Sequence, residues 1–551
     1  MKEETKNLYV AIVLSILIIF GVNHFFAPKQ TAQVQQKVEV VPEVKKAEEP
    51  KIAEALPVED VLRTDKRVLI ETPSLKGSLK LKGARFDFLE LTKYKKTLEK
   101  NSADVQLLSP AGTEDAYFAE FGFLSVDPNS VPNAETTWKN LTSKLTPSTP
   151  LTLEWENGSG LKFIRQISID DHYLMTISDT VENNSGKNVT LYPFGRINRV
   201  YDKKNETRSV VHEGITGVIN DTAKEIKLSS IKEGDPKKFD ASQAWLGFSD
   251  RYWFTAFILE GDQENNLTVS NNGENNYQVD YRAAPMNIVS GSAKTHTVKF
   301  FAGAKEIKLL DRYTKQEGIQ KFDLAVDFGW YYFLTKPFFY ILDFLYHLIG
   351  NMGWAILLFA ALLRLFMFPI ANKSFESMSK MKKVQPKVMA LQAQYKDNKA
   401  LLQQRTMELY RNEKINPAAG CLPIFIQIPI FFSLYKVLNI AIEIRHAPFI
   451  GWIKDLSAPD PLTVSVWSHI PLPAILDIGV WPILMGFTMW IQQKLNPAPT
   501  NKDQALMFTM LPFIFTLMLG HFASGLVIYW TLSNILSILQ QKAIMYKNGV
   551  K

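Results

Sequence analysis

The chain has 551 residues, of which 46% are hydrophobic and 21% are charged, and its formal net charge is +7. A mean hydropathy of −0.06 fits neither a wholly soluble protein nor one that lies entirely within a bilayer. The single cysteine, Cys421, excludes an intramolecular disulfide, so a domain outside the cytoplasm would depend on its hydrophobic core alone. The composition therefore predicts a chain with separate water-soluble and membrane-embedded parts.

The first 26 residues are predicted to form a transmembrane anchor. Residues 8–26 contain no Asp, Glu, Lys or Arg, and at about 1.5 Å per residue they are long enough to cross a hydrocarbon core of about 30 Å. A cleaved signal peptide is the alternative, but the apolar run is long for a signal core, and Phe25-Phe26-Ala27-Pro28 lacks the small residues of a cleavage site. Residues 27–60, with four prolines among Lys, Glu, Val and Gln, are predicted to be a disordered linker.

Residues 61–325 are predicted to fold as an antiparallel β-sandwich. Short runs of alternating apolar and polar residues, such as 161–169 and 277–281, are separated by turn signals such as Asn-Gly and Asp-Pro. The alternation is lost over residues 304–324, where a helix is expected. Residues 326–351 are predicted to contain an interfacial amphipathic helix, because their apolar side chains recur at helical spacing.

Residues 352–551 are predicted to form a five-helix membrane bundle. The apolar segments cover residues 352–370, 422–440, 475–491, 505–522 and 524–539, and the anchor brings the predicted spans to six. Residues 372–416 form a predicted helical hairpin with ten Lys or Arg against four Asp or Glu, whereas the loop 442–478 has two against four. The positive-inside rule places the hairpin and both termini in the cytoplasm and the sandwich in the periplasm of a bacterial inner membrane.

No constellation of catalytic or metal-binding residues stands out in the sequence. The eight histidines are scattered, and no P-loop or His-Glu-x-x-His spacing occurs. The best acid–histidine cluster, Asp170-Asp171-His172, lies between two strand-like runs, where a polar turn is the ordinary interpretation. We therefore expect no enzymatic activity, no metal, no cofactor and no nucleotide.

Polar side chains within the predicted spans are informative, because burying them in a bilayer is costly. Arg364 lies in an apolar run, and no acidic residue lies deep in any span to neutralise it. Its side chain either extends to the cytoplasmic interface, about 9 Å away by helical rise, or lines a water-filled groove open to the cytoplasm. Gln427 and Asn534 would line the same groove, although single polar residues of this kind also form hydrogen bonds between helices.

The hairpin carries basic residues that include Lys380, Lys382, Lys383 and Lys387. One explanation is a topology signal on a solvated helix face. The other is a contact surface for ribosomal RNA, anionic lipid or an incoming chain. A basic amphipathic helix suits either explanation.

A series of motifs resembles the YidC membrane protein insertases, a family with relatives in mitochondria and chloroplasts. The motifs include Asp327-Phe-Gly-Trp, the Arg364 span ending in Phe-Pro, Met378-Ser-Lys-Met, Asn416-Pro-Ala-Ala-Gly-Cys-Leu-Pro and Ser524-Gly-Leu-Val-Ile-Tyr-Trp. The likeness covers nearly the whole chain. Lys436 departs from the family pattern, because its span is usually uncharged at that position.

The resemblance implies a hydrophilic groove that is open to the cytoplasm and to lipid and closed on the periplasmic side. Arg364 matches the groove arginine, Trp530 matches an aromatic position of the last span, and Gln493, or Gln492 beside it, matches a polar position. The implied function is insertion and folding of client membrane proteins, alone or with the Sec translocon, from ribosome–nascent chain complexes. The outer domain would resemble the sandwich of sugar-processing mutarotases, a likeness that alone says nothing of activity.

Two other functions compete with insertion. A membrane-anchored periplasmic carbohydrate-binding protein would need only one span, so the other predicted spans and Arg364 argue against it. A transporter is disfavoured because the sequence has no internal repeat and no acidic residue within the spans for ion coupling.

Overall fold

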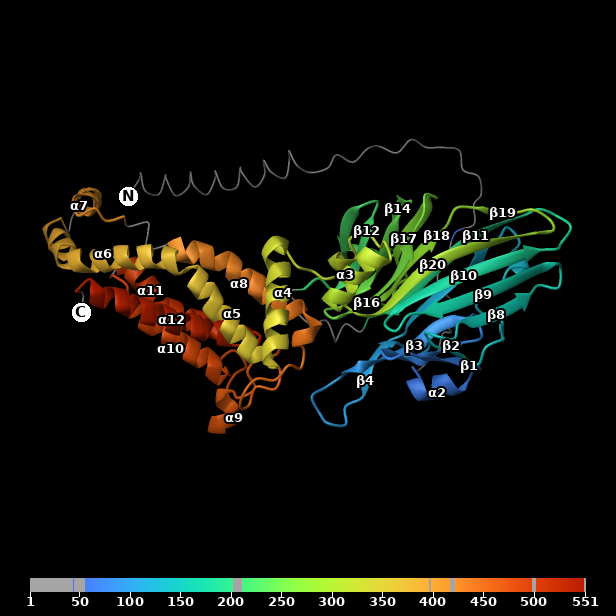
Figure 1. Cartoon of the computed structure of the whole chain (residues 1–551), viewed down its shortest axis with the longest axis horizontal. Helices are drawn as coiled ribbons and strands as arrows, with labels where there is room; N and C mark the ends of the chain where they lie inside the picture. Colours follow the sequence, from blue (N-terminus) through green and yellow to red (C-terminus); the bar gives the residue numbers. More distant parts are fainter. Residues whose placement is uncertain are drawn as a thin grey trace. The chain divides into compact units, whose positions relative to one another are not determined.

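The computed structural model describes residues 55–201, 211–395, 398–416, 422–497 and 502–549, together with residue 43. The predicted anchor, residues 1–26, and most of the predicted linker lie outside the described residues. Everything described from residue 55 onward belongs to one compact unit, in which a region of strands is followed by a region of helices (Figure 1).

The strands form two sheets. The larger sheet contains β1 (Arg67–Glu71), β2 (Leu75–Lys80), β3 (Arg85–Lys95), β4 (Asp104–Leu108), β5 (Tyr117–Leu124), β7 (Lys144–Leu145), β11 (Val189–Val200), β14 (Lys237–Ala241), β17 (Asn265–Asn271), β18 (Asn276–Arg282) and β19 (Met286–Ile288). The smaller sheet contains β6 (Lys139–Asn140), β8 (Leu151–Glu156), β9 (Leu161–Ile169), β10 (Leu174–Asn183), β12 (Gly214–Ile219), β13 (Thr222–Ile226), β15 (Ala244–Ser249), β16 (Trp253–Leu259) and β20 (Ser292–Ala304).

The sheet topology confirms the predicted antiparallel β-sandwich. The larger sheet has the order β14-β17-β18-β11-β5-β3-β2-β1-β7, and the other has the order β13-β12-β15-β16-β20-β10-β9-β8-β6. Among the described strands, β1 and β7 form a parallel pair, while the long pairings such as β10 with β20 and β11 with β5 are antiparallel. Neighbours such as β9 and β10 follow directly in sequence, as in hairpins.

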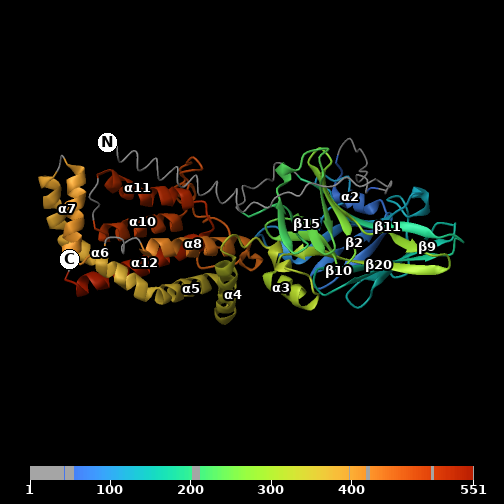
Figure 2. The same ribbon diagram turned by 90° about the horizontal axis from the view of Figure 1, so that it is seen from above.

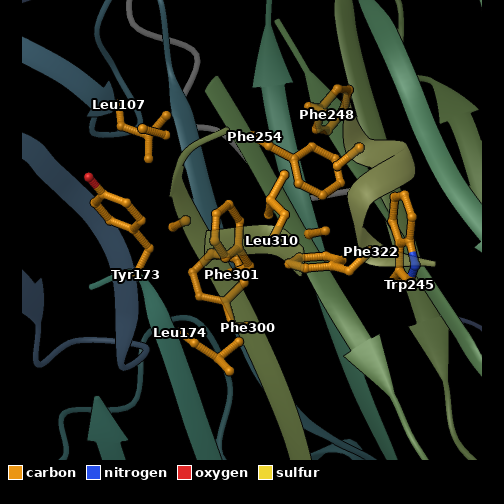
Figure 3. Close-up of a cluster of buried hydrophobic side chains, with 14 of the residues drawn as sticks. Leu107, Tyr173, Leu174, Trp245, Phe248, Phe254, Phe300, Phe301, Leu310 and Phe322 are labelled. Carbon is orange, nitrogen blue, oxygen red and sulfur yellow. The ribbon is translucent and has the colours of Figure 1, made fainter. Parts of the chain in front are cut away.

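The core of the sandwich follows from the period-two pattern of its strands. In β9 the apolar side chains are buried at every second position, whereas β5 and β15 are buried along nearly their whole length. Aromatic side chains pack on both faces of the smaller sheet. Between the sheets, Phe300 of β20 contacts Phe86 and Phe121 of the larger sheet. On the other face, beside α3, Phe254, Phe301 and Phe322 meet (Figure 3). The Phe301 and Phe322 ring centroids are 5.3 Å apart, within the range of favourable aromatic contacts.

Two short helices flank the sandwich. Helix α3 (Ile307–Gln316) lies within the stretch where the sequence predicts a helix, and α2 (Val58–Arg63) precedes β1 without having been predicted. Asp170-Asp171-His172 forms the turn between β9 and β10. The Asp170 carboxylate accepts hydrogen bonds from the backbone N–H groups of His172 and Leu174 at 2.9 and 3.0 Å. Such bonds are typical of an aspartate in a turn.

The helical region contains the elements α4 (Tyr332–Ile349), α5 (Met352–Phe366), α6 (Phe368–Gln394), α7 (Lys399–Asn412), α8 (Leu422–Ile440), α9 (Val464–Ser468), α10 (Val480–Leu495), α11 (Lys502–Leu519) and α12 (Ser524–Lys547). Helix α12 packs against α5, α6, α8 and α10, and α11 packs against α10 (Figure 1, Figure 2). Gly486 allows the α10–α11 approach, because a Cβ at this position would collide with Thr516.

Two helices begin elsewhere than the apolar pattern predicts, whereas α4 lies within the predicted residues 326–351. Helix α6 starts at Phe368 rather than at residue 372, because Pro369 favours the first turn of a helix. Helix α10 starts at Val480 instead of residue 475. There the Asp460 carboxylate accepts the backbone N–H of Trp481 at 2.8 Å and satisfies one of the free donors of the first turn.

Length and hydropathy alone do not single out any one described helix as a membrane span. The pair α5 and α6, bent by 66° at its break, satisfies both criteria together, and residues Phe425–Ile440 and Ala505–Leu519 are shorter apolar helices. Arg364 in α5 and Lys436 in α8 both lower the mean hydropathy of their helices.

Candidate functional site

Arg364 lies near the cytoplasmic end of α5 and faces α12. Its Nη2 donates to the backbone oxygen of Ser533 at 2.8 Å and lies 3.4 Å from the Ser533 hydroxyl. Its Nε is buried without a hydrogen-bond partner, and none of the described carboxylates forms an ion pair with the guanidinium. Arg364 therefore keeps a full positive charge that only neutral oxygens contact.

The predicted groove residues Arg364 and Gln427 contact one face of α12, whereas Asn534 lies on another face of that helix. Gln427 of α8 donates to the hydroxyl of Tyr529 at 3.1 Å. Because Tyr529 and Ser533 are one turn apart on α12, Arg364 and Gln427 approach the same face of that helix. Asn534, in contrast, is directed toward α10, where its amide donates to the Thr488 hydroxyl at 3.1 Å.

Trp530 and Gln493 occupy different surroundings. The Trp530 ring packs between Phe431 of α8 and Phe515 of α11, with centroids 4.7 and 5.6 Å away. Gln493 is half-buried near the cytoplasmic end of α10, as is Gln492 beside it. The structure therefore brings Arg364 and Gln427 together, and it places Asn534, Trp530 and Gln493 on other flanks of the bundle.

Polar contacts of α12 continue toward its cytoplasmic end. Gln540 donates to the side chain of Asn372 in α6 at 2.9 Å, and Gln541 donates to that of Asn496 after α10 at 3.1 Å. At the opposite end Leu526 and Ile528 are fully buried, and the Ser524 hydroxyl donates to the backbone oxygen of Asp455 at 3.1 Å. Helix α12 thus makes polar side-chain contacts from Tyr529 onward and packs mainly through apolar side chains between Ser524 and Tyr529.

The polar side chains of α12 from Tyr529 to Gln541 form a polar band along the helix. The sequence interpretation missed several of its members, including Tyr529, Ser533 and Gln541. Each lies in or next to an apolar stretch and looks like an ordinary helix residue in isolation. The available signal was the recurrence of hydroxyl and amide side chains on α12 at Thr531, Ser533, Asn534 and Ser537, which is denser than an apolar span needs.

The hairpin lysines divide into paired and unpaired residues. Lys380 forms an ion pair with Glu376 at 3.0 Å, and Lys387 forms one with Glu413 at 2.6 Å across the hairpin. Lys382 and Lys383 form no ion pair among the described residues. These two lysines leave positive charge available on the surface of α6.

Lys436, the cation that departs from the family pattern, is paired. Its Nζ lies 2.6 Å from the carboxylate of Asp327, in the segment before α4. Burial raises the pKa of Asp327, but the Lys436 ammonium outweighs it and holds the pKa below its ordinary value. Asp327 therefore stays ionised and neutralises the lysine.

Family models match both regions of the chain. The model described as the YidC periplasmic domain matches residues 67–341, and the 60Kd inner membrane protein model matches residues 344–550. A membrane protein insertase YidC from Methylobacterium radiotolerans is 43% identical, with 100% of this chain and 96% of the relative covered. The corresponding protein of Rickettsia canadensis is 45% identical, with 98% of this chain and 99% of the relative covered. The chain belongs to the YidC family of membrane protein insertases.

A member of this family is an inner-membrane insertase rather than an enzyme, and its β-sandwich is the periplasmic domain. Among solved structures, an active YidC insertase covers 87% of this chain at 16% identity with a TM-score of 0.38. A galactose mutarotase related enzyme from Lactobacillus acidophilus covers 43% at 8% identity with a TM-score of 0.31. Both scores are below 0.5, so these two likenesses carry no weight for the fold.

Proposed function

We propose that this insertase moves transmembrane segments of client proteins into the bilayer through a groove lined by Arg364, Gln427, Gln493, Trp530 and Asn534. The observation that carries the proposal is the isolation of Arg364, whose contacts are the neutral oxygens of Ser533. A structural arginine at this depth would be expected to have a carboxylate partner. Its absence among the described residues leaves the charge available to a client.

The helix tolerates Arg364. Even at the centre of a span an arginine costs about 2.5–3.5 kcal/mol on the insertion scale, and each Leu, Ile or Phe of the span offsets about 0.3–0.6 kcal/mol of this cost. Two opposite charges 4 Å apart attract by about 4 kcal/mol at an effective dielectric constant of 20. An acidic residue in the outer segment of a client would therefore be drawn to Arg364, part of the way across the membrane.

The client segment completes its own insertion. Transfer of its apolar surface into lipid is favourable by about 25 cal/mol per Å², so no nucleotide is required. The apolar outer half of α12, where Leu526 and Ile528 are buried, keeps the groove closed to the periplasm. The acidic segment then has a shorter part of the bilayer left to cross.

The remaining regions have supporting roles in this proposal. Residues 1–26 anchor the chain, 27–60 link the anchor to the periplasmic domain of residues 61–325, and residues 326–351 lie at the interface. Within the core of residues 352–551, the hairpin 372–416 receives ribosome–nascent chain complexes or clients from the Sec translocon. Lys382 and Lys383, which have no ion-pair partner among the described residues, supply the charge for this contact.

Photocrosslinking of a stalled client in inverted membrane vesicles tests the groove. A crosslinking amino acid at Gln427 or Trp530 should capture the client segment, whereas the same probe at Leu362, which is 43% exposed on α5, should not. Equal capture from Leu362 would mean that clients enter over the outer surface of the bundle, and the groove would have to be abandoned.

A further inference from the structure

A cavity of about 810 Å³ lies on the periplasmic side of the molecule, beside the outer end of α8. Arg364 of α5 does not line it. It is bounded by the β12–β13 hairpin, by the segment from Leu324 to Thr335, and by Phe432 and Lys436 of α8. Its volume is that of a site for a ligand of substantial size. The groove proposed above uses none of its lining residues.

Two contacts fix the walls of this cavity to one another. The Lys436–Asp327 ion pair joins α8 to the segment before α4, and the backbone N–H of His212 donates to the same carboxylate at 3.1 Å. Arg251 of the sandwich donates through Nε to the backbone oxygen of Asn439, at the outer end of α8, at 2.7 Å. These contacts join α8 to the other walls of the cavity.

The charged side chains of the β13 wall have no partners. Lys224, Glu225 and Lys227 form neither a side-chain hydrogen bond nor an ion pair with any residue that the structure describes, and all three line the cavity. Glu225 and Lys227 leave the extended backbone on one face, whereas Lys224 leaves it on the other face together with Ile226. One cation and one anion are thus presented on the same face. This pattern is complementary to a ligand that carries charges of both signs.

An aromatic wall faces the same space. Trp330, Tyr331 and Tyr332 line the cavity at the start of α4, and the Trp330 side chain is 100% exposed. A fully exposed tryptophan at the start of an amphipathic helix is typical of the headgroup level of a bilayer. The face of its ring is also a binding surface for an ammonium group.

An apolar stripe leads from the cavity along α8. Phe425, Ile428 and Phe432 are 66%, 43% and 49% exposed, and Lys436 follows one turn after Phe432. Their spacing places all four on one face of the helix. A molecule bound in the cavity can therefore extend apolar chains along a helix that spans the bilayer.

We propose that this cavity binds a glycerophospholipid of the outer leaflet whose headgroup carries both a phosphate and a primary ammonium. Lys227 binds the phosphate, while Glu225 and the Trp330 ring hold the ammonium. The acyl chains lie along Phe425, Ile428 and Phe432. The bound lipid fills the space between the sandwich and the outer end of α8 and seals the periplasmic side of the bundle.

Native mass spectrometry of the purified full-length chain tests the assignment, with phosphatidylethanolamine, phosphatidylglycerol and phosphatidylcholine as probes. The wild type should retain phosphatidylethanolamine in preference to the other two. The variant Lys227→Gln should bind it about tenfold more weakly, equivalent to about 1.4 kcal/mol. Glu225→Gln should lose the preference over phosphatidylglycerol while keeping affinity for the phosphate.

The matched control is Lys93→Gln, which removes one exposed lysine that does not line the cavity. It should retain the lipid as the wild type does. Equal retention by the control and by Lys227→Gln would overturn the site. Equal binding of phosphatidylglycerol and phosphatidylethanolamine to the wild type would overturn the headgroup assignment, and displacement of the lipid by inorganic phosphate alone would show that the acyl stripe contributes nothing.

Discussion

The arginines of the sandwich and of the bundle differ in burial and in their partners, since the sandwich contains buried arginines whereas Arg364 of the bundle is half-buried. In the sandwich, Arg165 is fully buried and forms a two-pronged contact with Asp179, with N–O distances of 2.7 and 2.8 Å. Glu120 is likewise held between Arg85 and Arg196. In the bundle, Ser533 is the only hydrogen-bond partner of Arg364 among the residues that the structure describes. A charge with its partner inside the fold contributes to structure, whereas we propose that the charge of Arg364 serves an incoming chain.

The largest expected effect lies in the sandwich. Asp179→Ala should lower the free energy of unfolding of the periplasmic domain by about 3–5 kcal/mol, because Arg165 would remain buried without its counter-charge. Denaturant unfolding of the full chain in detergent measures this change. Replacing both residues with apolar ones of similar size should restore much of the loss, and the exposed control Glu156→Ala should change it by less than about 0.5 kcal/mol. A small effect for Asp179→Ala would mean that water reaches Arg165.

A smaller effect is expected at the junction of the two regions. Lys436 and Asp327 retain 19% and 17% of their side-chain exposure, so their pair lies between the surface and buried cases. A double-mutant cycle with Asp327→Asn and Lys436→Gln should give a coupling energy of about 1 kcal/mol. Additive effects of the two substitutions would show that Lys436 is satisfied by solvent.

Glu443, in the short 3-10 turn after α8, should make stability depend on pH. Burial raises its pKa from the ordinary 4.5 to about 8, and its Oε2 has no hydrogen-bond partner. The folded state therefore binds a proton that the unfolded state has released, so stability should fall as pH rises from about 4.5 to about 8. Thermal melts across this range should show a weaker fall for Glu443→Gln than for the wild type or for the exposed control Glu99→Gln. An unchanged slope would show that Glu443 is ionised in the folded protein.

The smallest effect on insertion is expected from removing most of the sandwich. Deleting residues 61–305 while keeping α4 should leave client insertion largely intact, because the polar band of α12 is built by the helices. A depletion strain complemented with the deletion variant measures this. Complete loss of insertion by a variant that is itself stably inserted would make the sandwich part of the machinery.

The sequence predicts the sandwich and most helices because their information is local. The alternation of apolar and polar residues in β9 and the apolar run of α8 can be recognised from a few consecutive residues. The starts of α6 and α10 depend on Pro369 and on Asp460, and the second of these is distant in the chain from the helix that it caps. The partners of Arg364 and Lys436 are also distant in the chain. Both cations could be picked out by residue type in the sequence, but only the structure identifies their partners, Ser533 and Asp327.

The division between structural and available charges is tested most directly at Arg364. Insertion rates should be measured for two clients that differ only in an acidic or a neutral outer segment. Arg364→Ala should slow the acidic client about tenfold, equivalent to about 1.4 kcal/mol, and Arg364→Lys should keep most of the rate because it keeps the charge. The neutral client and the control variant Lys494→Ala should be little affected. If Arg364→Ala inserts the acidic client at the wild-type rate, Arg364 extends to the cytoplasmic interface instead, and attraction of the client's charge plays no part in insertion.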